Sequence, residues 1–297
     1  MKSHKARKGI LLAGGHGTRL RPLTNVISKH LLPLYDKPII FYPLSSMILA
    51  GLSEIMLITT PTESALYKKL LGDGSEFGIK LVYKEQLEPA GIAQALLIAE
   101  EWLDGAPSML MLGDNILLGT HVADRLQAAS RSVEGAIVFA HQVRDPERYG
   151  VVSFDKAGKP LDIIEKPKNP PSSWIVTGVY FYDGRAPSIA RSLKPSVRNE
   201  LEITDINHAY LEQNALTVER LGQGYAWMDV GMPEPLLRGA ELIKGLQDYS
   251  EHAVGSPLAS AYNMGRIDKN CFEAGIESLG NTSLARLLRN ELNKGNF

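Results

Sequence analysis

Three glycines and two arginines lie close together near the start of the chain, in a pattern that can bind phosphate. Gly14, Gly15 and Gly17 carry no Cβ atoms, so an anion can approach the backbone N–H groups of this turn. Arg19 and Arg21 bring positive charge into the same turn. This glycine turn therefore predicts a cradle for phosphate groups.

The glycine turn follows residues 10–13, an uninterrupted apolar run that predicts the first, central strand of a parallel sheet. Other glycine-rich loops have spacing rules that this one breaks. A dinucleotide-binding loop needs a third glycine where Leu20 stands, and an acidic residue where Thr59 and Thr60 end the second strand. A Walker loop needs Gly-Lys-Ser/Thr after four residues, and this is absent. A turn that only connects a strand to a helix stays an alternative.

Two aspartates stand at or near the ends of apolar runs. Asp114 follows the run 108–112, and Asp229 lies in the run 226–230. Taken singly, each is more often a turn or helix-cap residue than a ligand. Paired at the mouth of one sheet, the two carboxylates would suit Mg²⁺, which completes its octahedron with phosphate oxygens and water.

A glutamate and a lysine close a strand in the second half of the chain. Glu165 and Lys166 are neighbours, so a regular strand would point their side chains to opposite sides. The pair could bind a polar substrate, or it could be a solvated hairpin end.

The elements that must position these residues alternate between strand and helix in the first half. The expected strands are 10–13, 54–60, 80–84 and 108–112, and the expected helices are 37–50, 62–71 and 92–103. Repeated units of this kind form a parallel sheet with helices on both faces. Ligands of such sheets bind at the carboxyl ends of the strands, so the glycine turn, Gln86 and Asp114 should converge on one edge.

The second half mixes strands and helices. The expected strands are 136–143, 150–154, 161–165, 174–182, 217–221 and 226–230, and the expected helices are 203–213, 234–246 and 284–292. We therefore predict an α/β fold with a Rossmann-like, mostly parallel sheet, a mixed-strand segment and a C-terminal helical appendage.

The composition excludes several classes of protein. The formal charge is −1 and no charged tail is present, so nucleic acid is not an expected partner. No run approaches the ~20 apolar residues of a membrane span, and no secretory signal is expected. The single cysteine, Cys271, allows no internal disulfide and predicts a reducing, cytoplasmic location.

The glycine turn belongs to a set of motifs that resembles a known family. LAGGHGTRLRPLT at 12–24 and SKHLLP at 28–33 resemble the signature of the sugar-1-phosphate nucleotidylyltransferases, and the likeness continues in register over roughly residues 8–250. The further motifs are LGDGS at 71–75, LGDN at 112–115, DPERYGVV at 145–152, EKP at 165–167, VTGVYFYD at 176–183 and ELEITDIN at 200–207. Within the family, the motifs are most similar to the branch that makes dTDP-glucose.

The resemblance implies transfer of a nucleotidyl group from dTTP to glucose 1-phosphate, assisted by Mg²⁺. It divides the chain into a catalytic domain at 1–250, whose mixed-strand segment binds the sugar, and a helical extension at 251–297. The attacking sugar phosphate has a second pKa near ~6, so it is largely a dianion at pH 7 and needs no general base. The protein must instead align two anions and neutralise the leaving pyrophosphate.

The family's functional residues carry over one by one. The resemblance implies catalytic roles for Arg19, Lys29, Lys166, Asp114 and Asp229, with the metal held by Asp114 and Asp229. The implied nucleotide-binding residues are Gly14, Gly15, Gly17, Thr18, Arg19, Gln86, Gly91 and Asp114. The implied sugar-phosphate-binding residues are Asn115, Gly150, Glu165, Lys166, Val176 and Tyr180. Gln86 and Gly91 would read the pyrimidine base, because an amide can pair with both a carbonyl and a ring N–H.

Four positions depart from the residues usual in that branch. Glutamine is usual where His30 stands, aspartate where Ala90 stands, and threonine where Val230 and Met232 stand. These departures leave the reaction type intact. They keep UTP open as the nucleotide, and a related hexose or amino sugar open as the acceptor.

Two other functional classes remain as alternatives. A glycosyltransferase would carry an Asp-x-Asp metal motif, but Asp114 is followed by Asn115 and Ile116. A non-catalytic nucleotide sensor would need few of the five catalytic residues named above.

The amphipathic tail at 257–292 bears on assembly. Tyr262, Met264 and Phe272 would be exposed if the tail had nothing to cover it, which predicts contact between copies of the chain. The resemblance implies a homotetramer. The likeness is weak past residue 250, so the family's regulatory nucleotide site cannot be placed there.

Overall fold

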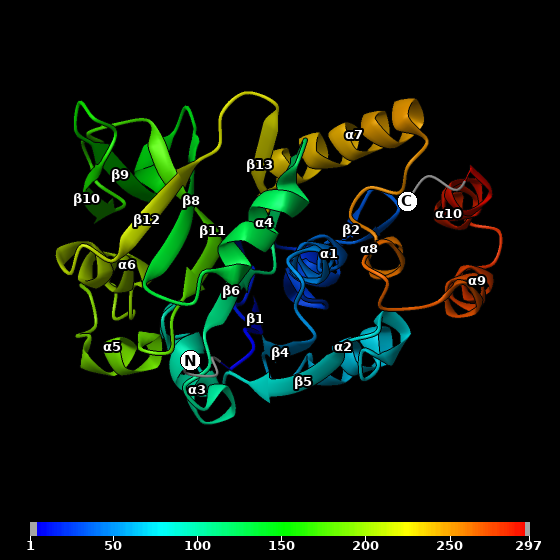
Figure 1. Ribbon diagram of the computed structural model, residues 1–297, viewed down its shortest axis with the longest axis horizontal. Helices are drawn as coiled ribbons and strands as arrows, with labels where there is room; N and C mark the ends of the chain where they lie inside the picture. Colours follow the sequence, from blue (N-terminus) through cyan, green and yellow to red (C-terminus); the bar gives the residue numbers. More distant parts are fainter. Residues whose placement is uncertain (1–4, 295–297) are drawn as a thin grey trace.

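The computed structural model describes residues 5–294, and a nine-stranded sheet forms its centre (Figure 1). The strands of this sheet are β1 (Lys8–Ala13), β4 (Glu54–Thr59), β5 (Lys80–Glu85), β6 (Ser108–Leu112), β8 (Ala136–Gln142), β9 (Gly150–Phe154), β10 (Pro160–Glu165), β11 (Trp174–Tyr182) and β12 (Leu216–Arg220). Two small antiparallel pairs lie outside it: β2 (Pro33–Leu34) with β3 (Lys37–Pro38), and β7 (Asn115–Gly119) with β13 (Tyr225–Asp229).

The sheet has a parallel half and a mixed half, as the sequence predicts. Strands β6, β1, β4 and β5 run parallel in that spatial order, so β1 is central to this half. Strand β11 joins β6 antiparallel and begins the mixed half, where β8 and β9 both pair with it. The change of direction at β11 places the β9–β10 hairpin beside the carboxyl end of the parallel half.

Ten helices lie within residues 5–294 and cover both faces of the sheet. They are α1 (Phe41–Leu49), α2 (Ser64–Leu71), α3 (Gln94–Leu103), α4 (Val122–Arg131), α5 (Ala186–Ser192), α6 (Ile203–Glu212), α7 (Pro233–Ser250), α8 (Pro257–Asn263), α9 (Lys269–Ser278) and α10 (Ser283–Lys294). No helix in this part of the chain has the length and apolar character that a membrane crossing requires.

The side chains of β1 point alternately to the two faces of the sheet, and the apolar core forms one layer on each face. Leu11 packs into the layer that contains side chains of α1, α2, α4 and the C-terminal helices. Ile10 and Leu12 pack into the layer on the other face, with side chains of α3, α5 and α6. Successive strand residues point to opposite faces, so one short apolar strand supports both layers.

The expected helix at 37–50 begins too early. Lys37 and Pro38 form β3 instead, paired with β2, and the helix starts at Phe41. The Lys37 ammonium is buried beside Asp36 and Gln247, which holds this stretch extended against α7. Strand β7 and helices α4 and α5 were not expected from the sequence.

The C-terminal tail packs on its own chain, so the argument that its aromatic residues need a second copy is wrong. Phe272 is fully buried, and its ring stacks on Tyr262 at a centroid distance of 4.5 Å. Gln127 on α4 donates a hydrogen bond to Met264 Sδ at 3.6 Å. Figure 1 shows α9 and α10 at the end of the molecule opposite the β9–β10 hairpin.

Candidate active site

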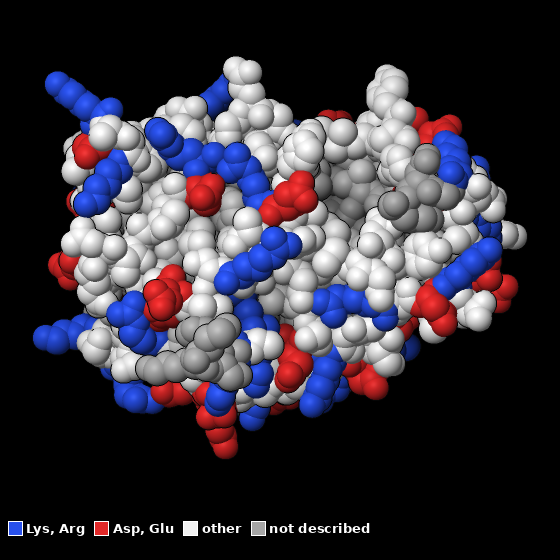
Figure 2. Space-filling view, in the orientation of Figure 1, with Lys and Arg blue, Asp and Glu red and all other residues white. Residues whose placement is uncertain are grey.

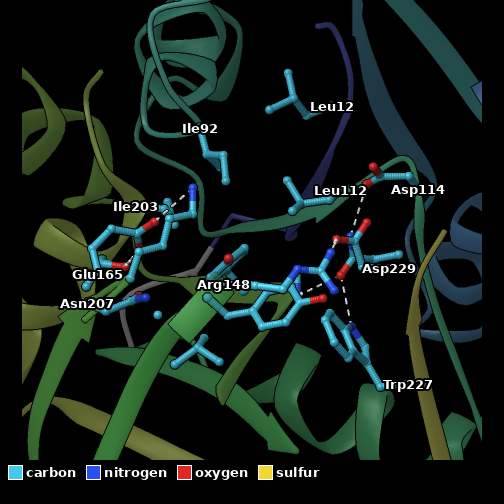
Figure 3. A pocket seen from close by; sticks show the side chains of 18 of the residues that line it. Leu12, Ile92, Leu112, Asp114, Arg148, Glu165, Ile203, Asn207, Trp227 and Asp229 are labelled. Carbon is cyan, nitrogen blue, oxygen red and sulfur yellow. Dashed lines mark hydrogen bonds and ion pairs between the residues drawn. The ribbon is translucent and has the colours of Figure 1, made fainter. Parts of the chain in front are cut away.

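A cavity of 480 Å³ opens where β1 and β6 end, and it extends to β10, β11 and α6 (Figure 3). Eleven of the residues predicted from the sequence line it: Gly14, Arg19, Lys29, Asp114, Asn115, Gly150, Glu165, Lys166, Val176, Tyr180 and Asp229. Segments as far apart as the glycine turn and β13 therefore meet at one place.

The remaining predicted residues lie outside the lining. These are Gly15, Gly17, Thr18, Gln86 and Gly91. Gln86 nevertheless sits beside the glycine turn, since a Cβ atom on Gly14 would lie 2.3 Å from its Oε1. Its Nε2 donates to Gln94 Oε1 at 2.6 Å, so the amide of Gln86 has a fixed orientation. The predicted convergence of the glycine turn and Gln86 is confirmed.

Gly91 has a structural requirement for glycine that is independent of any ligand. Its φ is +98°, and a Cβ atom there would lie 2.3 Å from the carbonyl oxygen of Leu201. A side chain would be strained by the backbone and would clash with the chain before α6.

Asp114 and Asp229 are brought together by the β7–β13 pair. Asn115 pairs with Asp229 in the strand register, and the Val230 N–H donates to the Asp114 carbonyl at 3.1 Å. A Cβ atom on Gly231 would lie 2.9 Å from Asp229 Oδ1 and 3.2 Å from Asp114 Oδ2. The two carboxylates thus approach each other beside Gly231, where a larger side chain would be crowded.

Positive charge lies on both sides of this carboxylate pair. Lys29 forms a salt bridge with Asp114 Oδ2. Nη2 of Arg19 lies 3.0 Å from the same Gly231 position, and Nη2 of Arg148 lies 3.8 Å from Asp229 Oδ2. An arriving anion would meet a site with cationic groups around two buried acids.

The two acids have opposite pKa shifts. Burial raises the pKa of Asp114, but the charge and hydrogen bond of Lys29 outweigh it, so the net pKa lies below its ordinary value. The pKa of Asp229 is raised, first by burial and then by the charge of Asp114, which Arg19 and Lys29 offset only in part. The positive groups around Asp229 therefore do not fully offset its burial and the charge of Asp114.

This carboxylate pair fits Mg²⁺. One carboxylate oxygen from each aspartate lies beside Gly231 in the cavity wall. Residues 5–294 contain no group of three or more His, Cys, Asp and Glu that could hold a metal alone. Mg²⁺ needs no such group, because it commonly takes one or two carboxylates and completes its shell with substrate phosphates and water.

Glu165 and Lys166 line the same cavity, because the strand does not stay regular at Lys166, the condition on which opposite sides were expected. Strand β10 ends at Glu165, and Lys166 adopts a left-handed backbone with φ +43°. The two charges lie 3.5 Å apart. Glu165 also accepts from Thr204 Oγ1 at 2.5 Å and from Arg198 Nη2 at 3.2 Å. The irregular backbone, which alternation cannot predict, turns Lys166 toward the cavity.

His30 also lines the cavity, although the sequence marked it only as an unusual residue. Burial is the main reason that its pKa falls to about 3, and the nearby Lys29 lowers it further, while Asp114 acts in the opposite direction. The imidazole is therefore neutral at pH 7.

Several other lining residues were missed. Arg148, Tyr149, Thr204, Asn207 and Trp227 line the cavity. The first four lie inside motifs that carry the family resemblance, and Thr204 and Asn207 are three residues apart, which places them on one face of α6. Trp227 is two residues before Asp229, and its Nε1 donates to Asn115 Oδ1 at 2.9 Å. Alternation along β13 could have found Trp227.

Comparison with known proteins agrees with this geometry. The family model described as nucleotidyl transferase matches residues 8–244. A glucose-1-phosphate thymidylyltransferase of Xanthomonas campestris pv. campestris is 50% identical over 267 residues, which is 90% of each chain. One from Neisseria gonorrhoeae is 45% identical over 97% of this chain and 100% of its own.

A solved structure from Bacillus anthracis shares the arrangement. That protein, provisionally described as a glucose-1-phosphate thymidylyltransferase and solved with a sucrose, is 40% identical, with a TM-score of 0.74 over 80% of this chain and 95% of its own. The sequence match over residues 8–244 includes every residue that lines the cavity.

Proposed function

Because the chain belongs to the nucleotidyl transferase family, we propose that it transfers a thymidylyl group from dTTP to glucose 1-phosphate, giving dTDP-glucose and pyrophosphate. The observation that carries the proposal is a single cavity with two functional ends. Arg19, Lys29, Asp114 and Asp229 form one end, and Glu165 and Lys166 form the other.

The reaction is a substitution at the α-phosphorus of the nucleotide. A phosphate oxygen of glucose 1-phosphate forms a bond to that phosphorus, the bond to the bridging oxygen of the β-phosphate breaks, and pyrophosphate leaves with the electron pair. The attacking phosphate is largely ionised at pH 7, so no side chain has to remove a proton. The protein's work is alignment and charge neutralisation.

We assign the basic residues to different phosphates. Arg19 and Lys29 lie beside the carboxylate pair and the glycine turn, so they neutralise the triphosphate and the leaving pyrophosphate. Lys166 lies at the sugar end and holds the phosphate of glucose 1-phosphate. Glu165 and Tyr180 would face the sugar hydroxyls. This division places each cation where charge must be balanced.

We assign the metal to Asp114 and Asp229. Bound Mg²⁺ would supply positive charge to the phosphate oxygens near the α-phosphorus. Lys29 shares Asp114 with that ion, so the lysine also holds the carboxylate ionised before the metal binds.

We propose dTTP as the nucleotide and UTP as its nearest competitor. The side chain of Gln86, oriented by Gln94, can pair with the edge that thymine and uracil share. The two bases differ by one methyl group, which a pocket discriminates by only ~1 to 3 kcal/mol. Some use of UTP is therefore expected.

One experiment tests this function directly. Pyrophosphate release would be measured over dTTP, UTP, CTP, ATP and GTP against several hexose 1-phosphates and amino-sugar 1-phosphates. The dTTP and glucose 1-phosphate pair should give the highest kcat/KM. A clear preference for ATP or GTP would remove Gln86 and Gly91 from the base site.

We also propose a homotetramer, with the number of copies taken from the family resemblance and one contact surface assigned to helix α7. Leu242, Leu246 and Tyr249 are exposed and spaced on one face of α7. Light scattering at micromolar concentration should give four times the chain mass, and Leu246→Glu should lower it. A monomer for the unaltered protein would contradict the proposal.

We place the enzyme in the cytoplasm. Cys271 is exposed and forms no disulfide, as expected in a reducing compartment. We expect no nucleic acid as a partner. On the face shown in Figure 2, basic and acidic residues are interspersed, so this face has no patch of one sign for a nucleic acid.

A further inference from the structure

A buried chain of hydrogen bonds runs from helix α2 to the cavity wall. The Tyr67 hydroxyl, on α2, donates to Ser28 Oγ at 2.9 Å. Ser28 Oγ lies 3.1 Å from His30 Nδ1, and the Tyr67 oxygen lies 3.3 Å from the same nitrogen. All three residues are buried, and of the three only His30 lines the cavity.

Counting hydrogens settles which nitrogen of His30 is protonated. The hydroxyls of Tyr67 and Ser28 have no acceptors in residues 5–294 other than each other and His30 Nδ1. If Nδ1 is bare, Tyr67 donates to Ser28 and Ser28 donates to Nδ1, so every hydrogen is used. If Nδ1 carries a hydrogen, one buried hydroxyl has no acceptor, which disfavours that tautomer strongly.

The hydrogen of the neutral ring therefore lies on Nε2. This nitrogen makes no hydrogen bond within the described residues, whereas Nδ1 has two neighbours. The ring packs on the backbone at the end of β6, since a Cβ atom on Gly113 would lie 2.8 Å from His30 Cδ2 and 3.2 Å from Nε2. Gly14, Lys29 and Asp114 share the same cavity wall.

We propose that Tyr67 and Ser28 are positioning residues that hold His30 as a fixed Nε2–H donor to an acceptor oxygen of the bound nucleotide. The identity of that nucleotide rests on the proposed function. A donor whose tautomer and ring orientation are set in advance loses little freedom when the ligand arrives. A base carbonyl and a phosphate oxygen both have the required chemistry.

The tautomer can be read in the unaltered protein. Long-range ¹H–¹⁵N spectra of the protein labelled at histidine should show His30 with a bare Nδ1 and a protonated Nε2, and His30→Gln assigns the signal by its disappearance. A protonated Nδ1 would overturn the proposal. This measurement needs no substrate, so it separates failure of the relay from failure of the proposed function.

The kinetic test asks whether the relay acts through His30. Tyr67→Phe should raise the KM for dTTP about 3-fold, because Ser28 still donates to Nδ1. The Ser28→Ala, Tyr67→Phe double variant should raise it about 10-fold or more, with the KM for glucose 1-phosphate within 2-fold of the unaltered value. In a His30→Ala background the same two changes should have no further effect on KM.

Tyr83→Phe is the matched control. Tyr83 loses a hydroxyl that donates to the Gly72 carbonyl at 2.6 Å and does not contact His30. It should leave both KM values unchanged. Equal losses with and without His30, or an equal rise in both KM values, would show a structural role and overturn the proposal.

A series of nucleotides locates the acceptor. An equal rise in KM for dTTP, UTP and CTP in the double variant places the hydrogen bond on an oxygen that all three share, in the phosphates, the sugar or the O2 carbonyl of the base. A rise confined to dTTP and UTP places it on the O4 carbonyl, which cytosine lacks. No rise for any of the three contradicts donation by His30.

Discussion

The two ends of the cavity are built differently. At the metal end, Asp114 and Asp229 are held by the sheet edge and the β7–β13 pair, and their side chains are only 8% and 11% exposed. At the sugar end, Lys166 is 43% exposed and lies just past a hairpin strand in a left-handed conformation. The reacting phosphates would therefore meet a rigid, buried site, whereas the sugar would meet a more open one.

Charge is also distributed differently at the two ends. Asp114 has one cationic partner, Lys29, and also accepts from Asn115 Nδ2 at 3.0 Å. Asp229 accepts from the Gly231 N–H at 3.1 Å, and its ion pair with Arg148 is long, at 3.8 Å. Glu165 instead shares its two oxygens among Lys166, Arg198 and Thr204. Removal of one side chain should therefore lower activity severely at the metal end and only gradually at the sugar end. At the sugar end Glu165 has two cationic partners, so one can substitute for the other.

The largest expected effect is at the metal end. Asp114→Asn and Asp229→Asn should each lower kcat by a factor on the order of 10²–10³, because each removes one carboxylate from a two-carboxylate site. Steady-state pyrophosphate release at saturating Mg²⁺ measures this. Near-normal turnover in Asp229→Asn would reject the metal assignment.

Stability should separate the same two variants. Asp229 has a raised pKa, so its ionised form is disfavoured on folding and Asp229→Asn should leave the free energy of unfolding unchanged or higher. Asp114→Asn leaves Lys29 without its partner and should cost roughly 2–3 kcal/mol. Equal melting temperatures for the two variants would contradict this asymmetry.

At the sugar end, one lysine should control one substrate. Lys166→Met should raise the KM for glucose 1-phosphate by about 10- to 100-fold and the KM for dTTP by much less, because the proposed assignment places the ammonium on the sugar phosphate alone. Lys168→Met, two residues further along the chain, is the control. Equal changes in both KM values would merge the roles of the two ends.

The buried ring of His30 should make stability depend on pH. The pKa of His30 falls from 6.5 to about 3 on folding, so the unfolded chain takes up the proton first as the pH drops. The contribution of the neutral His30 ring to the free energy of unfolding is complete above pH 6.5, and it is lost as the pH falls from 6.5 to about 3.

Between pH 7 and pH 5 this loss amounts to about 2 kcal/mol in the free energy of unfolding. Urea unfolding at the two pH values measures it. In His30→Gln this pH-dependent loss of stability should vanish. An identical pH dependence in the variant would show that His30 is not the group responsible.

The smallest effect should come from Thr204. Its hydroxyl donates to Glu165 Oε2, and Arg198 and Lys166 remain when it is removed. Thr204→Val should raise the KM for glucose 1-phosphate by about 3- to 10-fold and leave kcat nearly unchanged. The exposed Thr217→Val on β12 serves as the control. A fall in kcat as large as that of Asp229→Asn would erase the difference between the two ends.

Much of the framework could be predicted from local sequence. The apolar runs at β1, β4 and β6 are too short for helices and are bounded by turn residues, so their period and length identify them as buried strands. The alternation of strands and helices then requires a parallel sheet with ligands at its carboxyl edge. The positions of the glycine turn and Gln86 follow from this rule alone.

Local sequence failed where the backbone leaves a regular pattern or where distant strands pair. Alternation places Glu165 and Lys166 on opposite sides only in a regular strand, and the positive φ of Lys166 shows that the strand is not regular there. The apolar residues of the C-terminal helices could equally have covered a second copy or their own chain, since periodicity shows that a face is buried and not what buries it.

The sequence by itself determined the position of the glycine turn after the first strand, the parallel half of the sheet and the types of residue available for the chemistry, because these depend on residue type and short-range period. Only the tertiary structure decided which of those residues act together. The β7–β13 pair joins two aspartates that are far apart in the chain, and burial beside Ser28 and Tyr67 fixes the protonation of His30. Both depend on long-range contacts and on exclusion of water, which no stretch of sequence encodes alone.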